Sequence, residues 1–530
     1  MKRIFKIAAM SIIAMLAVAC AGGSRNANRE PVWNEAATIY YINLGQLHDK
    51  GNIAALNLDK FINELKEDGA PADLIKSILN NPSNSGIAAD KPAYIAIREF
   101  DDSFDPSDLY FACEISDVDK FDQTLKELAG DDFDNTDFSI VGDRRIIVLE
   151  ENEVIMGYDS ERLVLLVNTT AQADLNLMLN TQLDYAPADM SRFGNSDMAS
   201  YTDIDKFYNI FVNSDVAKAE FDAEVMEHIK TAYNGLFEEQ ANTINTLTFN
   251  DGTIVVDTQC EGMSEQVVAC YKKCNGELLN RLEASPIAVL NIGLNGEAIV
   301  DGINKIIELV LNANPDITID NETNIYKNIA LGVLGSFDGD FMLALSEANG
   351  KLEESDYRGS SPVFTTANAL FAVDVKDDYI MQNVKTYGGG FLTSQGENSY
   401  STDVYDNKIN IGQHDNVFFV GVNNNGEKKS NSAADQKWAA DVEDSYAYLM
   451  IDFDKFFNSS FGNALLSAVY SEMGRSERET TKRIINVIDK LTVISTGEDS
   501  TISSKCTLTL KDSNVNSLEQ IVMLIYNEAL

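Results

Sequence analysis

Apolar and polar positions along the chain form two patterns that alternate in order. Period-two alternation and short apolar runs predict strands, whereas apolar residues three or four positions apart predict amphipathic helices. Most strand-like runs are joined by hairpin-length turns, so neighbouring strands are expected to pair in the antiparallel sense. The pattern predicts an α+β fold of helices covering one face of a mostly antiparallel sheet.

The same order of predicted elements occurs twice, at a spacing of about 250 residues. Each series opens with a strand, Thr38–Leu44 or Ile287–Leu294, and continues with two helices, a strand pair and a capped helix. The corresponding segments are Ile53–Leu65, Ala72–Leu79, Ala93–Ile97, Leu109–Ile115 and Asp117–Leu128 in the first series, and Ala298–Leu311, Asn324–Leu334, Phe341–Leu345, Ala369–Val375 and Asp377–Tyr387 in the second.

The later parts of the two series also correspond. A strand leading into a helix recurs at 201–207 and 450–456, and a two-stranded ribbon recurs at 243–259 and 491–510. Both series are expected to close with an amphipathic helix, Glu265–Leu282 or Leu518–Leu530. The sequence therefore predicts two similar tandem halves, residues 36–283 and 286–530, with no long flexible linker between them.

The first twenty residues have the pattern of an export signal. Three basic residues precede an apolar run, Ile7–Val18, which is too short to span a membrane but suits a signal peptide. Cys20 follows Ala19, so residues 1–19 are predicted to be removed and Cys20 to carry lipid such as palmitate. Residues 20–35 then form a flexible tether. The alternative is a secreted protein in which Cys20 is not modified.

Charge limits the partners of the chain. The formal net charge is -42, and it becomes -45 when Lys2, Arg3 and Lys6 leave with the signal peptide. This charge repels phosphate backbones, so nucleic acid is not expected as a partner. The sequence around Cys20 resembles that of bacterial lipoproteins in which surface display is associated with acidic residues just after the Cys. None occurs between Ala21 and Arg29, so the resemblance implies a periplasm-facing position over display on the cell surface.

No motif for catalysis or cofactor binding is found. The three His residues are far apart in sequence, and neither a G-x-S-x-G elbow nor a phosphate-binding loop is present. Catalytic carboxylate pairs stay open, because such pairs are recognised by their separation in space. Three acidic segments, 101–108, 131–137 and 314–322, could hold calcium, but none has EF-hand spacing. Solvated turns are the favoured explanation, because so acidic a chain has such clusters by composition. No metal, cofactor or catalytic residue is therefore assigned.

Two further patterns have structural explanations. Asp-Lys-Phe occurs at 59–61, 119–121, 205–207 and 454–456, where Asp is expected to cap a helix and Phe to be buried.

Cys113, Cys260 and Cys506 lie in predicted strands, and Cys270 and Cys274 lie one turn apart in a predicted helix. Buried free thiols are expected, since a bridge within one helical turn has poor geometry.

Short motifs near both ends of the mature chain carry a family resemblance. They are the lipidation sequence at Cys20, the strand Tyr41–Leu44, the block Ala88–Ile95 and the segment Asn516–Gln520. Together they resemble a family of uncharacterised Bacteroidota lipoproteins that is known only as a domain of unknown function. The resemblance implies an outer-membrane lipoprotein and supplies no catalytic residues.

We therefore expect a lipid-anchored, non-catalytic binding or scaffolding module of the cell envelope. Its partners would be the membrane, through Cys20, and an envelope protein or glycan. The alternative is a carboxylate-dependent hydrolase acting on glycan or peptidoglycan. A calcium-stiffened adhesion protein is a third possibility.

Overall fold

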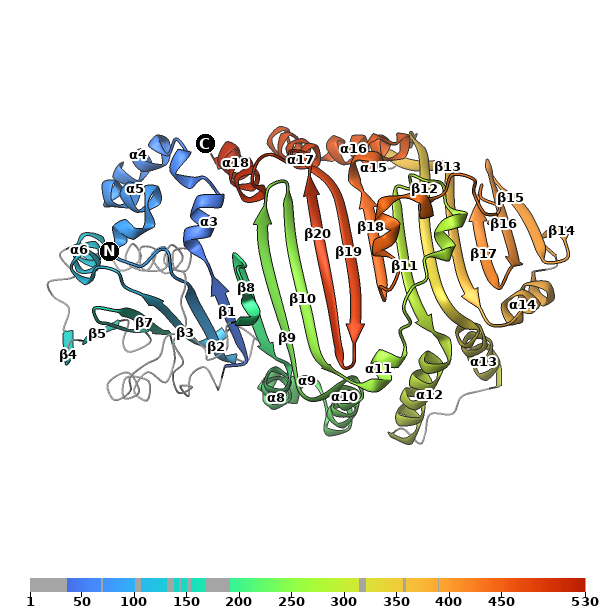
Figure 1. Cartoon of the computed structure of the whole chain (residues 1–530), viewed down its shortest axis with the longest axis horizontal. Helices are drawn as coiled ribbons and strands as arrows, with labels where there is room; N and C mark the ends of the chain where they lie inside the picture. Colours follow the sequence, from blue (N-terminus) through green and yellow to red (C-terminus); the bar gives the residue numbers. More distant parts are fainter. Residues whose placement is uncertain are drawn as a thin grey trace. The chain divides into compact units, whose positions relative to one another are not determined.

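The protein is described by a computed structural model that covers residues 36–67, 70–100, 106–130, 138–142, 144–149, 154–167, 191–313, 321–355, 359–388 and 390–529. Helices and antiparallel strands are mixed along the chain (Figure 1), which confirms the predicted α+β class. The chain forms two compact units. Unit 1 comprises the residues up to Asp222 together with 239–258 and 513–530, and unit 2 comprises 223–238 and 259–512.

Unit 1 contains short helices and ten strands or parts of strands among its described residues. The strands are β1 (Thr38–Ile42), β2 (Ala93–Phe100), β3 (Pro106–Glu114), β4 (Phe138–Val141), β5 (Arg144–Leu149), β6 (Val154–Tyr158), β7 (Arg162–Val167), β8 (Met198–Asp203), β9 (Phe237–Asn250) and β10 (Thr253–Met263). The helices are α3 (Leu44–Lys50), α4 (Asp59–Glu67), α5 (Ala72–Asn80), α6 (Val118–Ala129), α8 (Ile204–Asn213), α9 (Asp215–Glu220) and α18 (Ser517–Ala529).

The first strand of unit 1 lies between a strand close in sequence and one far away. β1 pairs antiparallel with β2 and with β8, so that Tyr41 lies opposite both Tyr94 and Ala199. β2 pairs with β3, β3 with β7, and β4 to β7 follow as hairpins, while β8 pairs with β9 and β9 with β10.

Two apolar clusters cover the two faces of this sheet. Side chains alternate between the faces of a strand, so Tyr110 belongs to one cluster and its neighbour Phe111 to the other. The second cluster includes Phe121 of α6. This helix begins where the Asp117 carboxylate accepts the Lys120 N–H at 3.0 Å, as expected of an N-cap.

Unit 2 contains the longer strands. They are β11 (Ala288–Asn295), β12 (Phe337–Ser355), β13 (Gly359–Val375), β14 (Thr393–Gly396), β15 (Ser399–Val404), β16 (Asn407–His414), β17 (Val417–Val422), β18 (Ala447–Asp452), β19 (Ile488–Glu498) and β20 (Thr501–Leu510). The helices are α10 (Ala223–Leu236), α11 (Glu265–Ala269), α12 (Gly296–Ala313), α13 (Asn321–Gly335), α14 (Tyr379–Tyr387), α15 (Phe453–Asn458), α16 (Ser460–Glu472) and α17 (Arg475–Val487), and the 3-10 turns include η6 (Glu277–Arg281).

The strand pairings of unit 2 repeat the succession seen in unit 1. β11 pairs antiparallel with β12 and β18, β12 with β13, and β13 with β17, while β14 to β17 follow as hairpins and β18 pairs with β19 and β19 with β20. The β12–β13 hairpin extends beyond its partners. α16 packs on this extension, where the rings of Phe364 and Phe461 stack at 3.5 Å.

The predicted closing helix Glu265–Leu282 is wrong over most of its length. α11 ends at Ala269, and η6 begins only at Glu277. The intervening residues are held by other segments, because the Lys272 N–H donates to the Gly293 carbonyl and the Cys274 N–H to the Ser445 carbonyl. A helical periodicity over eighteen residues was overridden by these tertiary contacts. The other predicted closing helix is confirmed as α18.

No described helix combines the length and the apolar character needed to cross a bilayer.

We predict that deletion of residues 513–530 loosens unit 1 and leaves unit 2 unchanged. In unit 1 the Gly252 N–H donates to the Val515 carbonyl at 3.0 Å, and the Tyr526 hydroxyl donates to the Asn57 carbonyl at 2.6 Å. Hydrogen exchange should therefore accelerate at Gly252 and around Asn57, with β12–β13 protected as before. Ile525→Ala, at an exposed position of α18, is the matched control. Unchanged exchange at Gly252 would contradict the prediction.

Candidate functional site

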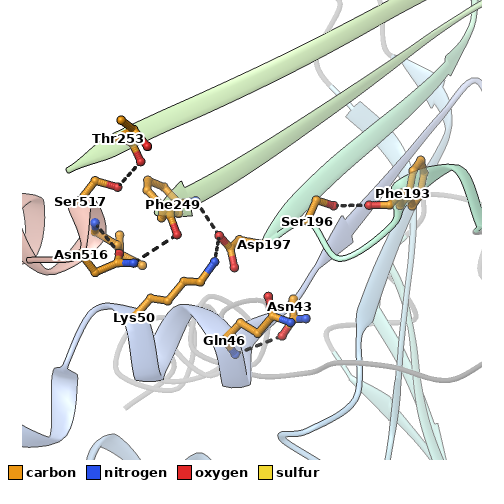
Figure 2. A network of polar contacts seen from close by, with 11 residues as sticks. Asn43, Gln46, Lys50, Phe193, Ser196, Asp197, Phe249, Thr253, Asn516 and Ser517 are labelled. Carbon is orange, nitrogen blue, oxygen red and sulfur yellow. Dashed lines mark hydrogen bonds and ion pairs between the residues drawn. The ribbon is translucent and has the colours of Figure 1, made fainter. Parts of the chain in front are cut away.

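A buried carboxylate joins three segments of unit 1 that are far apart in sequence (Figure 2). Asp197 is 0 % exposed, and its Oδ2 accepts the Lys50 ammonium at 2.7 Å and the Phe249 N–H at 2.7 Å. A buried carboxylate needs such donors, because burial without a partner costs several kcal/mol. The contact ties α3 and β9 to the segment before β8.

The start of α3 explains why Lys50 reaches this position. Asn43 ends β1 and caps the helix, because its side chain accepts the Gln46 N–H at 3.1 Å. The Asn43 N–H donates to the Asp197 carbonyl at 2.7 Å. The helix therefore begins beside Asp197, and its last residue brings the Lys50 ammonium back to the carboxylate.

The same network reaches the C-terminal helix. Asn516 donates to the Phe249 carbonyl at 3.2 Å and Ser517 to the Thr253 carbonyl at 2.8 Å, just before and inside the start of α18 (Figure 2). Ser517 is fully buried. Because Phe249 is bonded through its N–H to Asp197 and through its carbonyl to Asn516, the β9–β10 turn links α18 to α3.

This network has the character of a structural tie. One oxygen of Asp197 is saturated by Lys50 and Phe249, and the other, Oδ1, accepts no hydrogen bond from the described residues. Burial, offset in part by Asn43, raises the pKa of the nearby Tyr41 hydroxyl, so Tyr41 stays neutral at physiological pH. The network contains one carboxylate, which is insufficient for a two-carboxylate mechanism.

Unit 2 brings two carboxylates together. Asp340 is 0 % exposed and accepts the N–H groups of Asn275 and Gly276, both at 3.0 Å, and the Asn291 side chain at 3.2 Å. The Asp340 N–H in turn donates to Asp374 Oδ2 at 2.9 Å. Asp340 therefore fixes the segment between α11 and η6, and Asp374 fixes Asp340.

Burial changes the protonation of this pair. It raises the pKa of Asp374 to about 6, and the neighbouring charge of Asp340 acts in the same direction. Burial also raises the pKa of Asp340, against the effect of its three donors. A carboxyl with a pKa near 6 can donate or accept a proton near neutral pH. Asp340 is enclosed by its donors, so the pair presents one titrating carboxyl, Asp374.

Gly339 lets the two carboxylates approach. Its φ is +144°, and a Cβ at this position would lie 2.8 Å from Asp374 Oδ2. A residue with a side chain would be strained there and would collide with the carboxylate. Sequence reasoning missed this pair. The only available signal was the Asp338-Gly339-Asp340 triplet, which does not identify Asp374 as its partner.

The described cysteines are free, and their surroundings make them poor nucleophiles. Cys113 and Cys274 are buried as predicted, whereas Cys260, Cys270 and Cys506 are only half-buried. Burial raises the pKa of Cys260, Cys270 and Cys506, and raises the pKa of Cys274 to about 11. The thiolate is the reactive form, so these residues are largely protonated at physiological pH. Cys20, the predicted lipid attachment residue, lies outside the described residues.

The acidic segments predicted as possible calcium ligands lie largely outside the described residues, at 101–105, 131–137 and 314–320. Over the part of the chain that the structure describes, no three His, Cys, Asp or Glu side chains are grouped for metal binding. The calcium hypothesis for those segments stays a prediction.

The Asp-Lys-Phe interpretation needs correction. The capping residues are Asp117, Asp203 and Asp452, each two positions before the Asp of the motif, which lies in the first helical turn. Phe121 is buried, whereas Phe61 and Phe207 are exposed. The motif is structural, but the cap was placed too late in the sequence.

Comparison with known proteins gives a family and no function. A family model described as "Domain of unknown function (DUF4836)" matches residues 31–518. No curated protein matches. Solved structures of TP0453 in crystal forms I and III match with 11 % identity, covering 45 % and 48 % of this chain and 80 % and 84 % of theirs, at TM-scores of 0.23 and 0.20.

We predict that Lys50→Met destabilises unit 1 by about 3–5 kcal/mol, because it leaves a buried carboxylate without its cation. Asp197→Asn in the same chain should restore part of the loss, since the amide needs no counter-charge. Denaturant unfolding measures both, with Lys437→Met at an exposed position as control. If Lys50→Met matches the control, the ion pair does not stabilise the fold.

The raised pKa of Asp374 predicts a pH-dependent contribution to stability. A carboxyl whose pKa rises from 3.8 to about 6 on folding stabilises the protein fully below pH 3.8, and this stabilisation is lost as pH rises through about 6. Asp374→Asn removes the titration and keeps an acceptor for the Asp340 N–H. The variant should melt above the wild type at pH 7.5, with a smaller difference at pH 4. A pH-independent difference would contradict the raised pKa.

Proposed function

We propose that this chain, which belongs to the family with the domain of unknown function DUF4836, is a non-catalytic binding or scaffolding protein of the bacterial envelope. In this proposal it is a Bacteroidota-type lipoprotein. Lipid on Cys20 holds it at the outer membrane, and the folded part faces the periplasm. The partner is an envelope protein, a glycan or another envelope ligand, and nucleic acid is disfavoured by the charge of -42.

The proposal rests on the hydrogen bonds of the buried ionisable groups. Asp197 and Asp340 accept hydrogen bonds that fix neighbouring segments, and the buried Arg281 donates to the Gly426 carbonyl. Groups committed in this way serve the fold, whereas a catalytic group must reach its substrate. The strands of unit 2 meanwhile keep one face partly exposed. Binding on the sheet is therefore favoured over chemistry.

The recurring strand pairings support the tandem halves as part of this proposal. In each half, the first strand lies between the second and eighth strands of that half, and the third pairs with the seventh. We infer that residues 36–283 and 286–530 are two copies of one repeated fold. A duplicated scaffold lets one copy keep the structural role while the other diverges in its surface.

A hydrolase is the second candidate, and Asp374 is the observation that favours it. A carboxyl with a pKa of about 6 beside a second carboxylate is the arrangement expected of a general acid. This reading predicts release of sugar or peptide fragments from cell-wall material by the wild type and none by Asp374→Asn.

We predict that the full chain carrying Cys20→Ala retains an envelope partner and releases no product. Membrane fractionation should show loss of the membrane-bound pool when Cys20 is replaced, because the lipid is the anchor. Thermal melting with cell-wall glycans, followed by product analysis, separates binding from hydrolysis, since a native-state ligand raises the melting temperature. Product formation that depends on Asp374 would contradict the non-catalytic proposal.

A further inference from the structure

One face of the unit 2 sheet is apolar and incompletely covered. β11 and β18 alternate regularly between buried and half-buried residues, so each has one face in the core and one open face. Leu343 of β12 is 43 % exposed. The same strand buries Met342, which lies on the opposite face. Each of these strands therefore has one side in the core and one side that is incompletely covered.

Cross-strand pairs place the open-face residues in two rows, because directly opposed residues share a face. The first row crosses five strands and the second lies two residues away along each strand. They are Leu343, Leu290, Leu449, Val493 and Cys506 in the first row, and Leu345, Ala288, Ile451, Leu491 and Leu508 in the second. Every position in these rows, called here the apolar rows, is uncharged in a chain with 83 acidic residues.

The corresponding row of unit 1 is polar on β8, β9 and β10. Tyr40 lies opposite Ile95 and Ser200, and Ser200 lies opposite Asn245. Asn245 donates to Ser200 at 3.2 Å and accepts the Thr258 hydroxyl at 2.8 Å. The same strand positions can thus form a self-satisfied polar surface. Unit 2 has leucine, valine and cysteine where unit 1 has serine, asparagine and threonine.

A basic helix adjoins the apolar rows. α17 leads directly into β19, which carries Leu491 and Val493. Between residues 475 and 483 it has four basic and two acidic side chains. Arg475, Lys482 and Arg483 are exposed. Figure 1 shows α15–α17 at one end of these strands and α12 and α13 at the other. The rows lie toward the α15–α17 end, because Ala288 begins β11 and Ile451 is one residue before the end of β18.

We propose that unit 2 binds one long-chain lipid with an anionic head group, its tail along the apolar rows and its head group at α17. Five strands span roughly 19 Å at the usual spacing, which suits an extended acyl chain. The uncharged floor matches the tail, and the basic helix matches the head group. The large negative charge of the chain disfavours a second copy on this face. This assignment rests on the proposed binding function and names its ligand class.

The test uses equilibrium dialysis of radiolabelled palmitate, below its aggregation concentration, against the full chain carrying Cys20→Ala. Leu449→Ser/Val493→Asn/Cys506→Thr transfers the polar row of unit 1 and should weaken binding at least tenfold. Arg475→Glu/Lys482→Glu/Arg483→Glu leaves the sheet untouched and should also weaken it at least tenfold. The control Lys273→Glu/Lys428→Glu/Lys437→Glu makes the same charge change elsewhere in unit 2 and should bind like the parent chain.

Each remaining outcome is decisive. Binding of one palmitate per chain, with the methyl ester at least tenfold weaker, supports a single-lipid site with an anionic head group. Absence of palmitate binding, or equal binding by the row-transfer variant, would overturn the proposal. Binding only to phosphatidylglycerol vesicles would point to a membrane surface, and dimerisation through the row would point to a second copy, so either would also overturn it. An envelope partner retained without palmitate binding would reject the lipid site and leave the broader binding proposal intact.

Discussion

The pairing of one central strand with a near and a distant neighbour is the constraint on which each unit depends. β1 holds β2 on one side and β8, about 160 residues away, on the other. β11 does the same with β12 and β18. A slip of one residue would exchange the two faces of every strand. Tyr41 and Val289 would then leave the core, so the register determines both what is buried and what is presented.

Buried charges act at the ends of these strands. Asp197 precedes β8 and accepts the Phe249 N–H of β9. Asp340 lies near the start of β12 and accepts the N–H groups of Asn275 and Gly276, which lie outside the helices and strands. A carboxylate suits this task because it accepts several hydrogen bonds at once. The two sites differ in their charge balance: Lys50 compensates Asp197, whereas Asp374 adds a second carboxyl beside Asp340. Burial raises the pKa of both carboxyls of unit 2, and the charge of Asp340 adds to the rise at Asp374.

The sequence predicted the strands and most helices because local signals and tertiary structure agree there. Period-two runs gave β1, β2, β3 and β11, and acidic caps gave α6. The helix predicted over 265–282 was wrong, because its periodically spaced apolar residues lie partly in a turn. The Gly276 N–H of that turn donates to Asp340. The Asp340–Asp374 contact and the apolar rows could not be predicted from one sequence, since both depend on registers between distant strands. Leu449 and Val493 look like ordinary core residues until their face is known.

One register gives β11 and β18 of unit 2 a buried face and an open face. Accessibility of two adjacent positions on β18 tests it directly. Leu449→Cys and Met450→Cys would be alkylated under native conditions and the labelled peptide quantified by mass spectrometry. We predict fast modification at position 449 and protection at position 450. Protection of position 449 together with modification of position 450 would contradict it.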